Sequence, residues 1–185
     1  MQILETKRLI VREIDPASDA EFILALLNSP GFLRYIGDRG VRTAEQSTEF
    51  IENRLRKSYR DNGFGLYAVD LKSGHETDMP SAGAGSLNGS TGICGFVKRH
   101  GLPHADLGFA FLPQFEKKGY AFESADAVMR YGRSVLGLDR VLAITSIDND
   151  ASGRLLAKLG FKFDGLILLP HSEEQLKLFS SSPAV

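Results

Sequence analysis

The stretch from Leu112 to Glu123 combines residue types that suit phosphate binding. It joins a predicted strand to a predicted helix through a short loop. The backbone N–H groups in the first turn of a helix lack intrahelical partners, and the helix dipole adds about half a positive charge there. Such an end binds phosphate, while Gly119 lets the backbone approach a ligand and Lys117 and Lys118 add positive charge. We interpret the loop as a diphosphate site, with a plain connection carrying solvated lysines as the alternative.

Other ligand-binding patterns are missing from the sequence. No Gly-Lys-Ser/Thr ending of a Walker-type loop occurs, and no GxGxxG motif follows a predicted strand. The four histidines (75, 100, 104 and 171) lie outside any recognisable metal-ligand spacing, so we expect no metal. The single cysteine, Cys94, excludes an internal disulfide and a multi-cysteine zinc site. We interpret Cys94 as a small buried strand residue, since no base is paired with it for nucleophilic chemistry.

The composition is typical of one soluble domain. The chain has 185 residues, of which 43% are hydrophobic and 24% charged. A net charge of −1, from 22 basic and 23 acidic residues, gives no basic surplus for nucleic-acid binding. No apolar run approaches the roughly 18 residues of a membrane span, and the first residues do not resemble a signal peptide. We therefore expect one cytoplasmic domain over residues 1–185, with no nucleic-acid or membrane partner.

Hydrophobic periodicity and capping signals predict strands and helices on both sides of this loop. Two capping boxes, Ser18 with Glu21 and Thr43 with Gln46, predict two early helices. The order strand, helix, strand around the loop requires a crossover and therefore a parallel pair, whereas the first half is antiparallel. The predicted strands are 8–12, 64–69, 92–97, 106–112, 141–145 and one or two after 161 that include 175–179. The predicted later helices are 120–136 and 151–159. The sequence therefore predicts an α/β chain with a mixed sheet.

Residues 72–91 separate two predicted antiparallel strands and are rich in Gly, Ser, Asp and Asn. The segment is longer than a usual hairpin loop of about 2–5 residues. We interpret it as a flexible hairpin insertion, with a substrate lid as the functional alternative.

Four segments of the chain resemble the GNAT superfamily of acyl-CoA-dependent N-acyltransferases, and more closely its branch of ribosomal-protein N-terminal acetyltransferases. Thr6 to Arg12 resembles the opening strand of that branch, and Gly92 to Val97 its third strand. Asp106 to Glu123 resembles its cofactor motif, and Asn149 to Ser152 with Leu159 to Phe161 its second signature. The resemblance implies an α/β (α+β) fold, in which a mixed, mostly antiparallel central sheet has helices on both faces. It also implies acetyl transfer from acetyl-CoA to an amine.

The diphosphate loop of this family has the pattern Arg/Gln-x-x-Gly-x-Gly/Ala. Gln114 and Gly119 match its first and last positions, and Lys117 replaces its first glycine. If that position needs a positive φ, a lysine is strained there. The resemblance implies that backbone N–H groups around the loop hold the diphosphate of the cosubstrate acetyl-CoA.

The resemblance further implies that the pantetheine arm pairs with the open edge of strand 106–112. Tyr120 either hydrogen-bonds near the cosubstrate or packs in the core. Asn149 matches the family position that bonds the arm or a water molecule, and it could equally cap its helix. The implied cofactor-binding residues are Phe111, Leu112, Gln114, Lys117, Lys118, Gly119, Tyr120, Ala121 and Asn149.

Acyl transfer to an amine needs a base for the amine proton, a donor for the carbonyl oxygen and an acid for the thiolate. By the resemblance, Asp106 is the catalytic base, acting directly or through water; capping a turn or pairing with Arg99 is the alternative. His104 is a second candidate base because imidazole titrates near working pH, with an exposed loop histidine as its alternative. Ser152 matches the serine that some members use as the acid, or is an ordinary residue of a first helical turn.

Two other groups of polar residues have weaker functional assignments. Glu123, in a first helical turn, is expected to act structurally, since the helix dipole favours a carboxylate there. Asp38, Arg39 and Arg42 lie between the first helices, in the region that shapes the acceptor groove in the family. They could read the charge of the acceptor or form a solvated turn.

Three functions remain open at this point. The first is an N-acetyltransferase, the second a catalytically silent acyl-CoA-binding module, and the third a phosphate-ligand binder without preference for CoA. The acceptor is a protein N-terminus, a small-molecule amine or an antibiotic. Both a monomer and a homodimer are compatible with the sequence.

Overall fold

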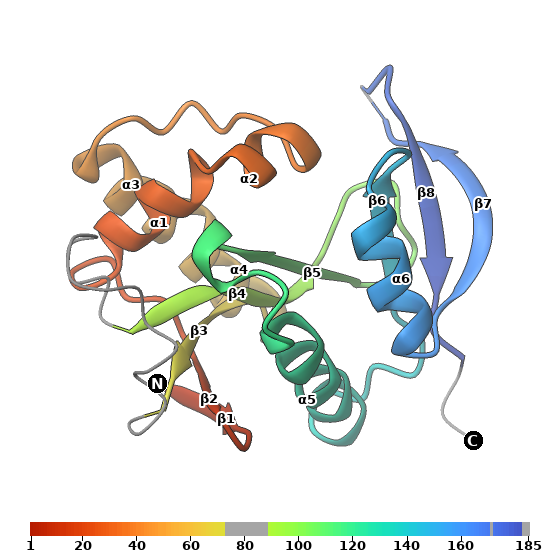
Figure 1. Ribbon diagram of the computed structural model, residues 1–185, viewed down its shortest axis with the longest axis horizontal. Coiled ribbons are helices and arrows are strands. Elements are labelled where there is room, and N and C mark those ends of the chain that lie inside the picture. Colours follow the sequence, from red (N-terminus) through yellow and green to blue (C-terminus); the bar gives the residue numbers. More distant parts are fainter. Residues whose placement is uncertain (73–88, 171, 183–185) are drawn as a thin grey trace.

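One eight-stranded sheet runs through the computed structural model, which describes residues 1–72, 89–170 and 172–182 (Figure 1). The strands are β1 (Gln2–Glu5), β2 (Leu9–Arg12), β3 (Leu66–Leu71), β4 (Ser90–Val97), β5 (Asp106–Phe111), β6 (Leu142–Ser146), β7 (Lys162–Leu168) and β8 (Gln175–Ser180). Their order in the sheet is β1-β2-β3-β4-β5-β6-β8-β7. Neighbours are antiparallel except β5 and β6, which are parallel. The predicted mixed, mostly antiparallel sheet is confirmed.

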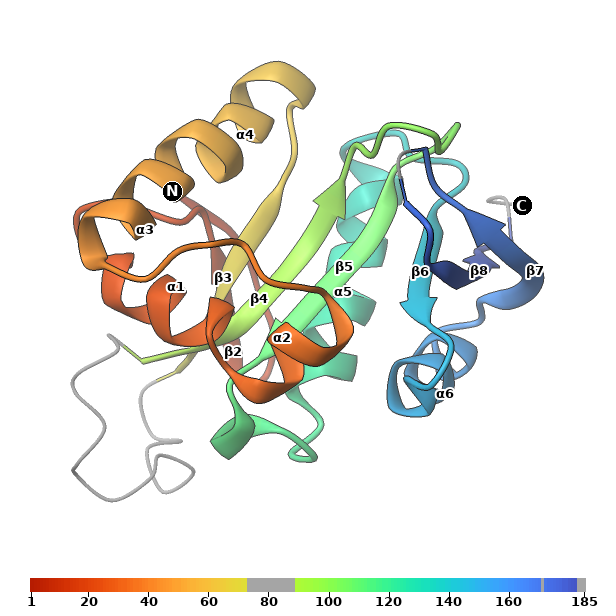
Figure 2. The same cartoon turned by 90° about the horizontal axis from the view of Figure 1, so that it is seen from above.

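Helices cover both faces of this sheet, as Figure 2 shows. One face carries α1 (Ala20–Leu27), α2 (Pro30–Tyr35), α3 (Ala44–Phe50), the π-helical turn η1 (Ile51–Arg56) and α4 (Lys57–Asn62). The other face carries α5 (Tyr120–Ser134), and α6 (Asp150–Lys158) packs beside β6. A short 3-10 turn, η3 (Pro113–Phe115), connects β5 to the loop before α5. The helices expected on both faces are therefore present.

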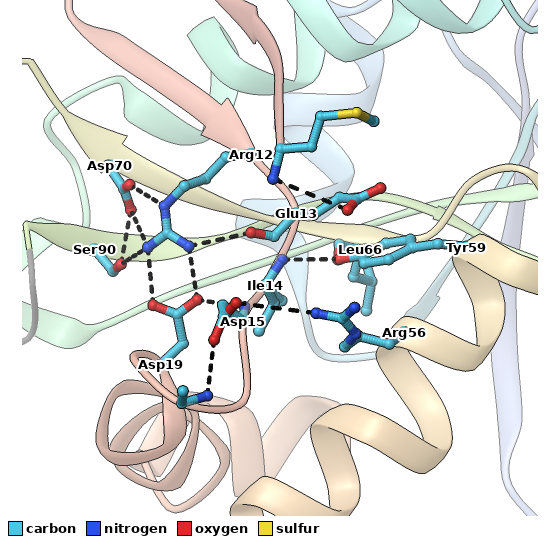
Figure 3. A network of polar contacts seen from close by, with 12 residues as sticks. Arg12, Glu13, Ile14, Asp15, Asp19, Arg56, Tyr59, Leu66, Asp70 and Ser90 are labelled. Carbon is cyan, nitrogen blue, oxygen red and sulfur yellow. Dashed lines mark hydrogen bonds and ion pairs between the residues drawn. The ribbon is translucent and has the colours of Figure 1, made fainter.

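A buried charge cluster fastens α1 to the sheet (Figure 3). The Arg12 guanidinium on β2 donates to both carboxylate oxygens of Asp19, at 2.6 and 2.9 Å, and its Nε donates to Asp70 on β3 at 2.6 Å. Asp19 is fully buried, and Ser90 on β4 joins the same cluster. The hydrogen bonds from Arg12 to Asp19 are the main cause of a raised Arg12 pKa. Asp19 is the N-cap residue of α1 but makes no cap hydrogen bond, so the predicted capping box at Ser18 is wrong.

The structure confirms Thr43 as the N-cap of α3, while the reciprocal bond of the second predicted capping box goes to the residue before the cap. Thr43 Oγ1 accepts a hydrogen bond from the Gln46 amide at 3.3 Å, and Gln46 Oε1 accepts one from the Arg42 amide at 2.7 Å. The helix that begins here is not uniform, because it widens into the π-helical turn η1 before continuing as α4. One predicted helix is thus three consecutive segments, of which two are α-helical and the middle one is π-helical.

Close contact between α5 and β4 fixes this helix against the sheet. A Cβ atom on Gly132 would come within 2.5 Å of the Phe96 ring, so only glycine permits the observed approach. Ala125 and Val128 are fully buried in the same interface. The packing holds the N-terminal end of α5 next to the end of β5.

The β3 and β4 strands pair as predicted, and the Leu71 amide donates to the Gly89 carbonyl at 3.0 Å where the hairpin closes. Residues 73–88 of the predicted flexible insertion lie outside the described residues.

Candidate active site

The loop before α5 contains two residues with left-handed backbone. Lys117 has a φ of 60° and Gly119 a φ of 85°; Lys117 is the only non-glycine residue with a positive φ in the described ranges. No side chain caps the start of α5, of which Gly119 is the N-cap residue. The loop therefore turns sharply into a helix end whose first amides point out of that end along the helix axis, as an anion site requires.

Arg8, the residue before β2, holds this loop in place. Its Nη1 donates to the Lys118 carbonyl at 3.1 Å, and its Nε donates to Glu123 Oε2 at 2.7 Å. Its guanidinium lies 4.6 Å from the centroid of the buried Tyr120 ring, and a Cβ atom on Gly119 would meet its Nη2 at 3.3 Å. The sequence predicts Arg8 only as a strand residue. The contacts of Arg8 with this loop were missed, because no spacing pattern relates a residue to a helix more than a hundred residues away.

Glu123 has the structural role expected for it. Its Oε1 accepts from the Thr6 hydroxyl at 2.6 Å and from the Arg8 amide at 2.9 Å. Burial alone would raise the pKa of Glu123, but these hydrogen bonds, with that from the Arg8 guanidinium, lower it. The carboxylate therefore stays ionised and ties the first turn of α5 to the β1–β2 turn.

Strand β5 has an unpaired edge beside this loop. It pairs with β6 at one position, Asp106 with Leu142, and no other β5–β6 pair occurs although both strands are described throughout. The Leu112 amide donates to the Thr91 carbonyl of the β4 side at 2.9 Å. Because backbone groups alternate along a strand, the amide and carbonyl of Phe111 point to the opposite edge, toward β6. Phe111 is thus placed to pair with an extended ligand, whereas the Leu112 amide is already engaged.

The backbones of β5 and β6 separate beyond their one pair, and helices lie on both sides of this wedge between the two strands (Figure 1). Ser146, at the end of β6, donates from its hydroxyl to the Tyr35 carbonyl of α2 at 3.0 Å. On the other side, the Lys158 ammonium of α6 lies 4.2 Å from the centroid of Phe122 in the first turn of α5. The two strand ends therefore diverge inside a frame made by α2, α5 and α6.

Asn149 and Ser152 lie on the β6 side of this wedge. Asn149 is the N-cap residue of α6, and its Oδ1 accepts from the Ser152 amide at 3.1 Å, so the capping interpretation is confirmed. The Ser152 hydroxyl is half-buried and makes no hydrogen bond within the described part of the chain. Contact of Asn149 with the cosubstrate and proton donation by Ser152 to the leaving thiolate both remain predictions. Gln114, in η3, and Ala121, in the first turn of α5, are likewise half-buried and lie on the β5 side.

Asp106, the first residue of β5, is a buried carboxylate with one bound oxygen. Its side chain is 2% exposed, and Oδ2 accepts from Nη2 and Nε of Arg99 at 3.2 and 3.4 Å. Oδ1 is buried with no hydrogen-bond partner among the described residues. Burial raises the pKa of Asp106, and the Arg99 charge opposes part of this rise. The pairing with Arg99, predicted as the alternative to a catalytic role, is confirmed. Because Oδ1 has no such partner, the role of Asp106 as base remains a prediction.

The remaining candidates are less suited to catalysis. His104 is exposed, as its alternative interpretation expected, and lines a cavity of about 420 Å³ together with Leu138 and Arg140 beside the C-terminal end of α5. Cys94 is buried, and burial raises the pKa of its thiol to about 12. A neutral buried thiol is a poor nucleophile, which agrees with the structural interpretation of Cys94.

The left-handed lysine leads to a testable prediction. We expect Lys117→Gly to leave the free energy of unfolding unchanged or to raise it by up to about 1 kcal/mol, because glycine removes the cost of a positive φ. The matched control is Lys118→Gly, which deletes the same charge where φ is not positive and should lower stability by about 0.5–1 kcal/mol. Urea denaturation without ligand measures both, and equal shifts would contradict strain at Lys117.

The described ranges contain neither a membrane-spanning helix nor a metal-binding group. No helix there is both long and apolar enough to cross a bilayer. No group of three or more His, Cys, Asp or Glu side chains is placed there to hold a metal ion.

Comparison with known proteins gives consistent matches over almost the whole chain. A sequence model described as the acetyltransferase (GNAT) domain matches residues 8–162. The uncharacterised N-acetyltransferase YoaA of Bacillus subtilis (strain 168) is 33% identical over 167 residues, covering 89% of this chain and 85% of that protein. A crystal structure of a GNAT-family acetyltransferase from Bacillus anthracis has a TM-score of 0.71 at 25% identity, covering 97% of each chain. RimL, the ribosomal L7/L12 alpha-N-protein acetyltransferase solved with coenzyme A, has a TM-score of 0.77 at 15% identity, covering 99% and 98%, and is similar in fold.

Proposed function

Since the chain belongs to the GNAT acetyltransferase family, we propose that it transfers an acetyl group from acetyl-CoA to a primary amine of a small molecule or a protein N-terminus. The observation that carries this proposal is the position of an uncapped helix start directly after a strand with an open edge. The helix start suits a diphosphate, and the open strand edge suits a chain of amides. CoA contains a diphosphate and such a chain.

The residues around the loop fit this cosubstrate. The amides from Lys117 to Ala121 would hold the diphosphate, and the backbone of Phe111 would pair with an amide of the pantetheine arm. Arg8 supports this arrangement because it fixes the Lys118 carbonyl and, through Glu123, the first turn of α5. It acts as a positioning residue, since its contacts hold the loop in one conformation.

Asp106 is our candidate for the base. The amine nitrogen attacks the thioester carbon, the N–C bond forms, and the amine proton passes to a carboxylate oxygen, either directly or through water. The C–S bond then breaks, and the CoA thiolate takes up one proton, for which the Ser152 hydroxyl is our candidate donor. Oδ1 of Asp106 supports the first role because it has no donor of its own, and a raised pKa makes a carboxylate a stronger base.

Calorimetry with CoA and with ATP tests the binding half of the proposal. We expect CoA to bind at least about tenfold more tightly than ATP, because only CoA has amides for the β5 edge. Ala121→Glu should weaken CoA binding by at least about tenfold, because its carboxylate faces the diphosphate, while the helix dipole keeps the helix stable. Arg130→Gln is the control: it makes the same charge change of −1 on an exposed residue farther along α5.

Equal affinities for CoA and ATP, or equal effects of the two variants, would contradict the assigned site. Thiol release from acetyl-CoA across a panel of amines tests the chemical half. CoA binding without acetyl transfer to any amine would instead favour a silent acyl-CoA-binding module.

A further inference from the structure

Two buried side-chain atoms lack a hydrogen-bond partner within the part of the chain that the structure describes: Oδ1 of Asp106 and Oγ1 of Thr145. Asp106 begins β5, and Thr145 lies near the end of β6. Buried polar atoms are almost always hydrogen-bonded in folded proteins, so each exception needs an explanation. Both exceptions lie on the two strands that separate beyond the pair of Asp106 with Leu142, which points to a ligand between these strands.

The side chain of Thr145 lies on the face of β6 that α6 covers. Thr145 pairs with Lys177 of β8, whose ammonium contacts Asp150 in the first turn of α6 at 3.1 Å. Two residues farther along β8, Phe179 shares that face, and a Cβ atom on Gly153 of α6 would meet its ring at 3.6 Å. Thr145 is 7% exposed, so its hydroxyl is shielded from bulk water beside the wedge.

Thr145 also stands level with the open edge of β5. Asp106 and Leu142 form a parallel pair, and Thr145 comes three residues after Leu142. Its counterpart on β5 is therefore Phe109, three residues after Asp106. Because side chains alternate along a strand, Thr145 and Phe109 share the face opposite to that of Asp106. This is the face on which α5 packs against β4.

A ligand arm that extends from the diphosphate loop meets these residues in a fixed order. The loop follows the end of β5, so an arm that pairs with the Phe111 backbone next reaches the level of Thr145, two residues or roughly 7 Å deeper in the wedge. Asp106 lies deeper still and on the other face of the sheet. The Thr145 hydroxyl therefore stands between the anion site and the candidate base.

The chemistry of this hydroxyl suits an amide. A threonine hydroxyl donates one hydrogen bond, which the carbonyl oxygen of an amide can accept. Rotation about the Cα–Cβ bond moves the hydroxyl among three staggered positions, so it can turn toward the wedge without a change in the backbone. A buried hydroxyl without a partner bears the full cost of leaving water, and a ligand that supplies the partner removes this cost.

We propose that Thr145 binds the acyl donor by donating from its hydroxyl to the carbonyl of the arm amide nearer the thioester. The inference rests on the proposed function, since it takes CoA as the carrier of the acyl group. Phe111 holds the arm from the β5 side and Thr145 from the β6 side, and together they direct the thioester toward Asp106. The site thus recognises donors whose arm carries an amide at this position, whereas a nucleotide diphosphate without an arm does not reach Thr145.

Two substitutions at Thr145 separate the hydroxyl from the shape of the side chain. In calorimetry, Thr145→Val should weaken CoA binding about tenfold, because a methyl group of similar size replaces the hydroxyl. Thr145→Ser keeps the hydroxyl and should keep the affinity within about twofold. ADP has the diphosphate without the arm, so it should bind the wild type and both variants equally. If Thr145→Val weakened CoA and ADP by the same factor, the residue would act through the loop, and the inference would be overturned.

Unfolding in urea without ligand tests whether the hydroxyl is free in the folded protein. Thr145→Val should raise the urea midpoint, because burying a methyl group does not cost a lost hydrogen bond to water. Thr91→Val is the matched control: Thr91 is fully buried on β4, and its hydroxyl already donates to the Val69 carbonyl at 2.8 Å, so the midpoint should fall. A fall for Thr145→Val as well would show that its hydroxyl is already bound, contrary to the inference.

Affinity and turnover together distinguish this inference from the proposed function. If Thr145→Val binds CoA as tightly as the wild type does, the contact is wrong and the transferase proposal stands. If Thr145→Val weakens CoA binding and the wild type acetylates no amine, the contact is supported and the transferase is contradicted. A wild-type protein that does not bind CoA would contradict both.

Discussion

Replacing Asp106 with asparagine is expected to lower kcat for acetyl transfer by about 100- to 10,000-fold, the usual contribution of a general base. Asparagine keeps the shape of the side chain, and its Oδ1 can still accept from Arg99, but it cannot take a proton. CoA affinity should not change, because the diphosphate loop lies beyond the other end of β5. The measurement is single-turnover acetyl transfer with saturating acetyl-CoA.

The same substitution should raise stability at neutral pH. The pKa of Asp106 is higher in the folded protein than in the unfolded chain, so the folded state binds this proton more readily. The ionised carboxylate therefore costs stability once the pH exceeds its unfolded pKa of roughly 4, and the cost is complete above the folded pKa. Because asparagine does not titrate, Asp106→Asn should gain stability over the wild type as the pH rises through this window. Urea denaturation at several pH values measures it.

Asp164→Asn is the matched control for both measurements. Asp164 also faces an arginine, Arg140, at 3.5 Å, but its side chain is 32% exposed. Such a surface pair contributes about 0–1 kcal/mol, so activity should be unchanged and stability nearly so. An Asp106→Asn enzyme with wild-type kcat would show that Asp106 serves only to pair with Arg99, and Ser152→Ala would then test the other catalytic assignment.

Long periodic elements and their ends could be predicted from the sequence because the signals are local. Gly119, Asn149 and Thr43 mark helix starts that the structure contains, and the strand–helix–strand order predicted the parallel pair. Three short elements were missed: β1, α2 and η3, with four, six and three residues. Elements of this length carry too few positions for periodicity, although Pro30 at the first turn of α2 is a usual start signal.

Side-chain partners far apart in sequence could not be predicted. Arg99 and Asp106 are seven residues apart across one turn, and their pairing was foreseen as an alternative. The contact of Arg8 with Glu123 depends on how α5 packs against β1 and β2, which no local pattern specifies. The wrong capping box at Ser18 has a similar cause, because the cap position is set by Asp19, whose carboxylate is bound by Arg12.

Disrupting the buried charge cluster of Arg12, Asp19 and Asp70 is expected to have the second large effect, a loss of stability. Arg12→Met is expected to lower the free energy of unfolding by about 3–5 kcal/mol, the usual cost of removing one partner from a buried ion pair. Methionine retains much of the side-chain volume but supplies no donor. Asp19, fully buried, and Asp70, 13% exposed, would then face each other without a counter-charge (Figure 3). Urea denaturation at neutral pH measures the loss, which corresponds to a Tm lower by roughly 6–20 °C.

Arg56→Met is the matched control, because Arg56 also pairs with carboxylates, Glu52 and Asp15, but with 38% of its side chain exposed. Its loss should cost about 1 kcal/mol or less. If the large effect comes from uncompensated charge, adding Asp19→Asn to Arg12→Met should recover part of the lost stability, since one of the two buried negative charges is then absent. Equal losses for Arg12→Met and Arg56→Met would mean that solvent screens the cluster despite its burial, and α1 would then be held to the sheet by its apolar face alone.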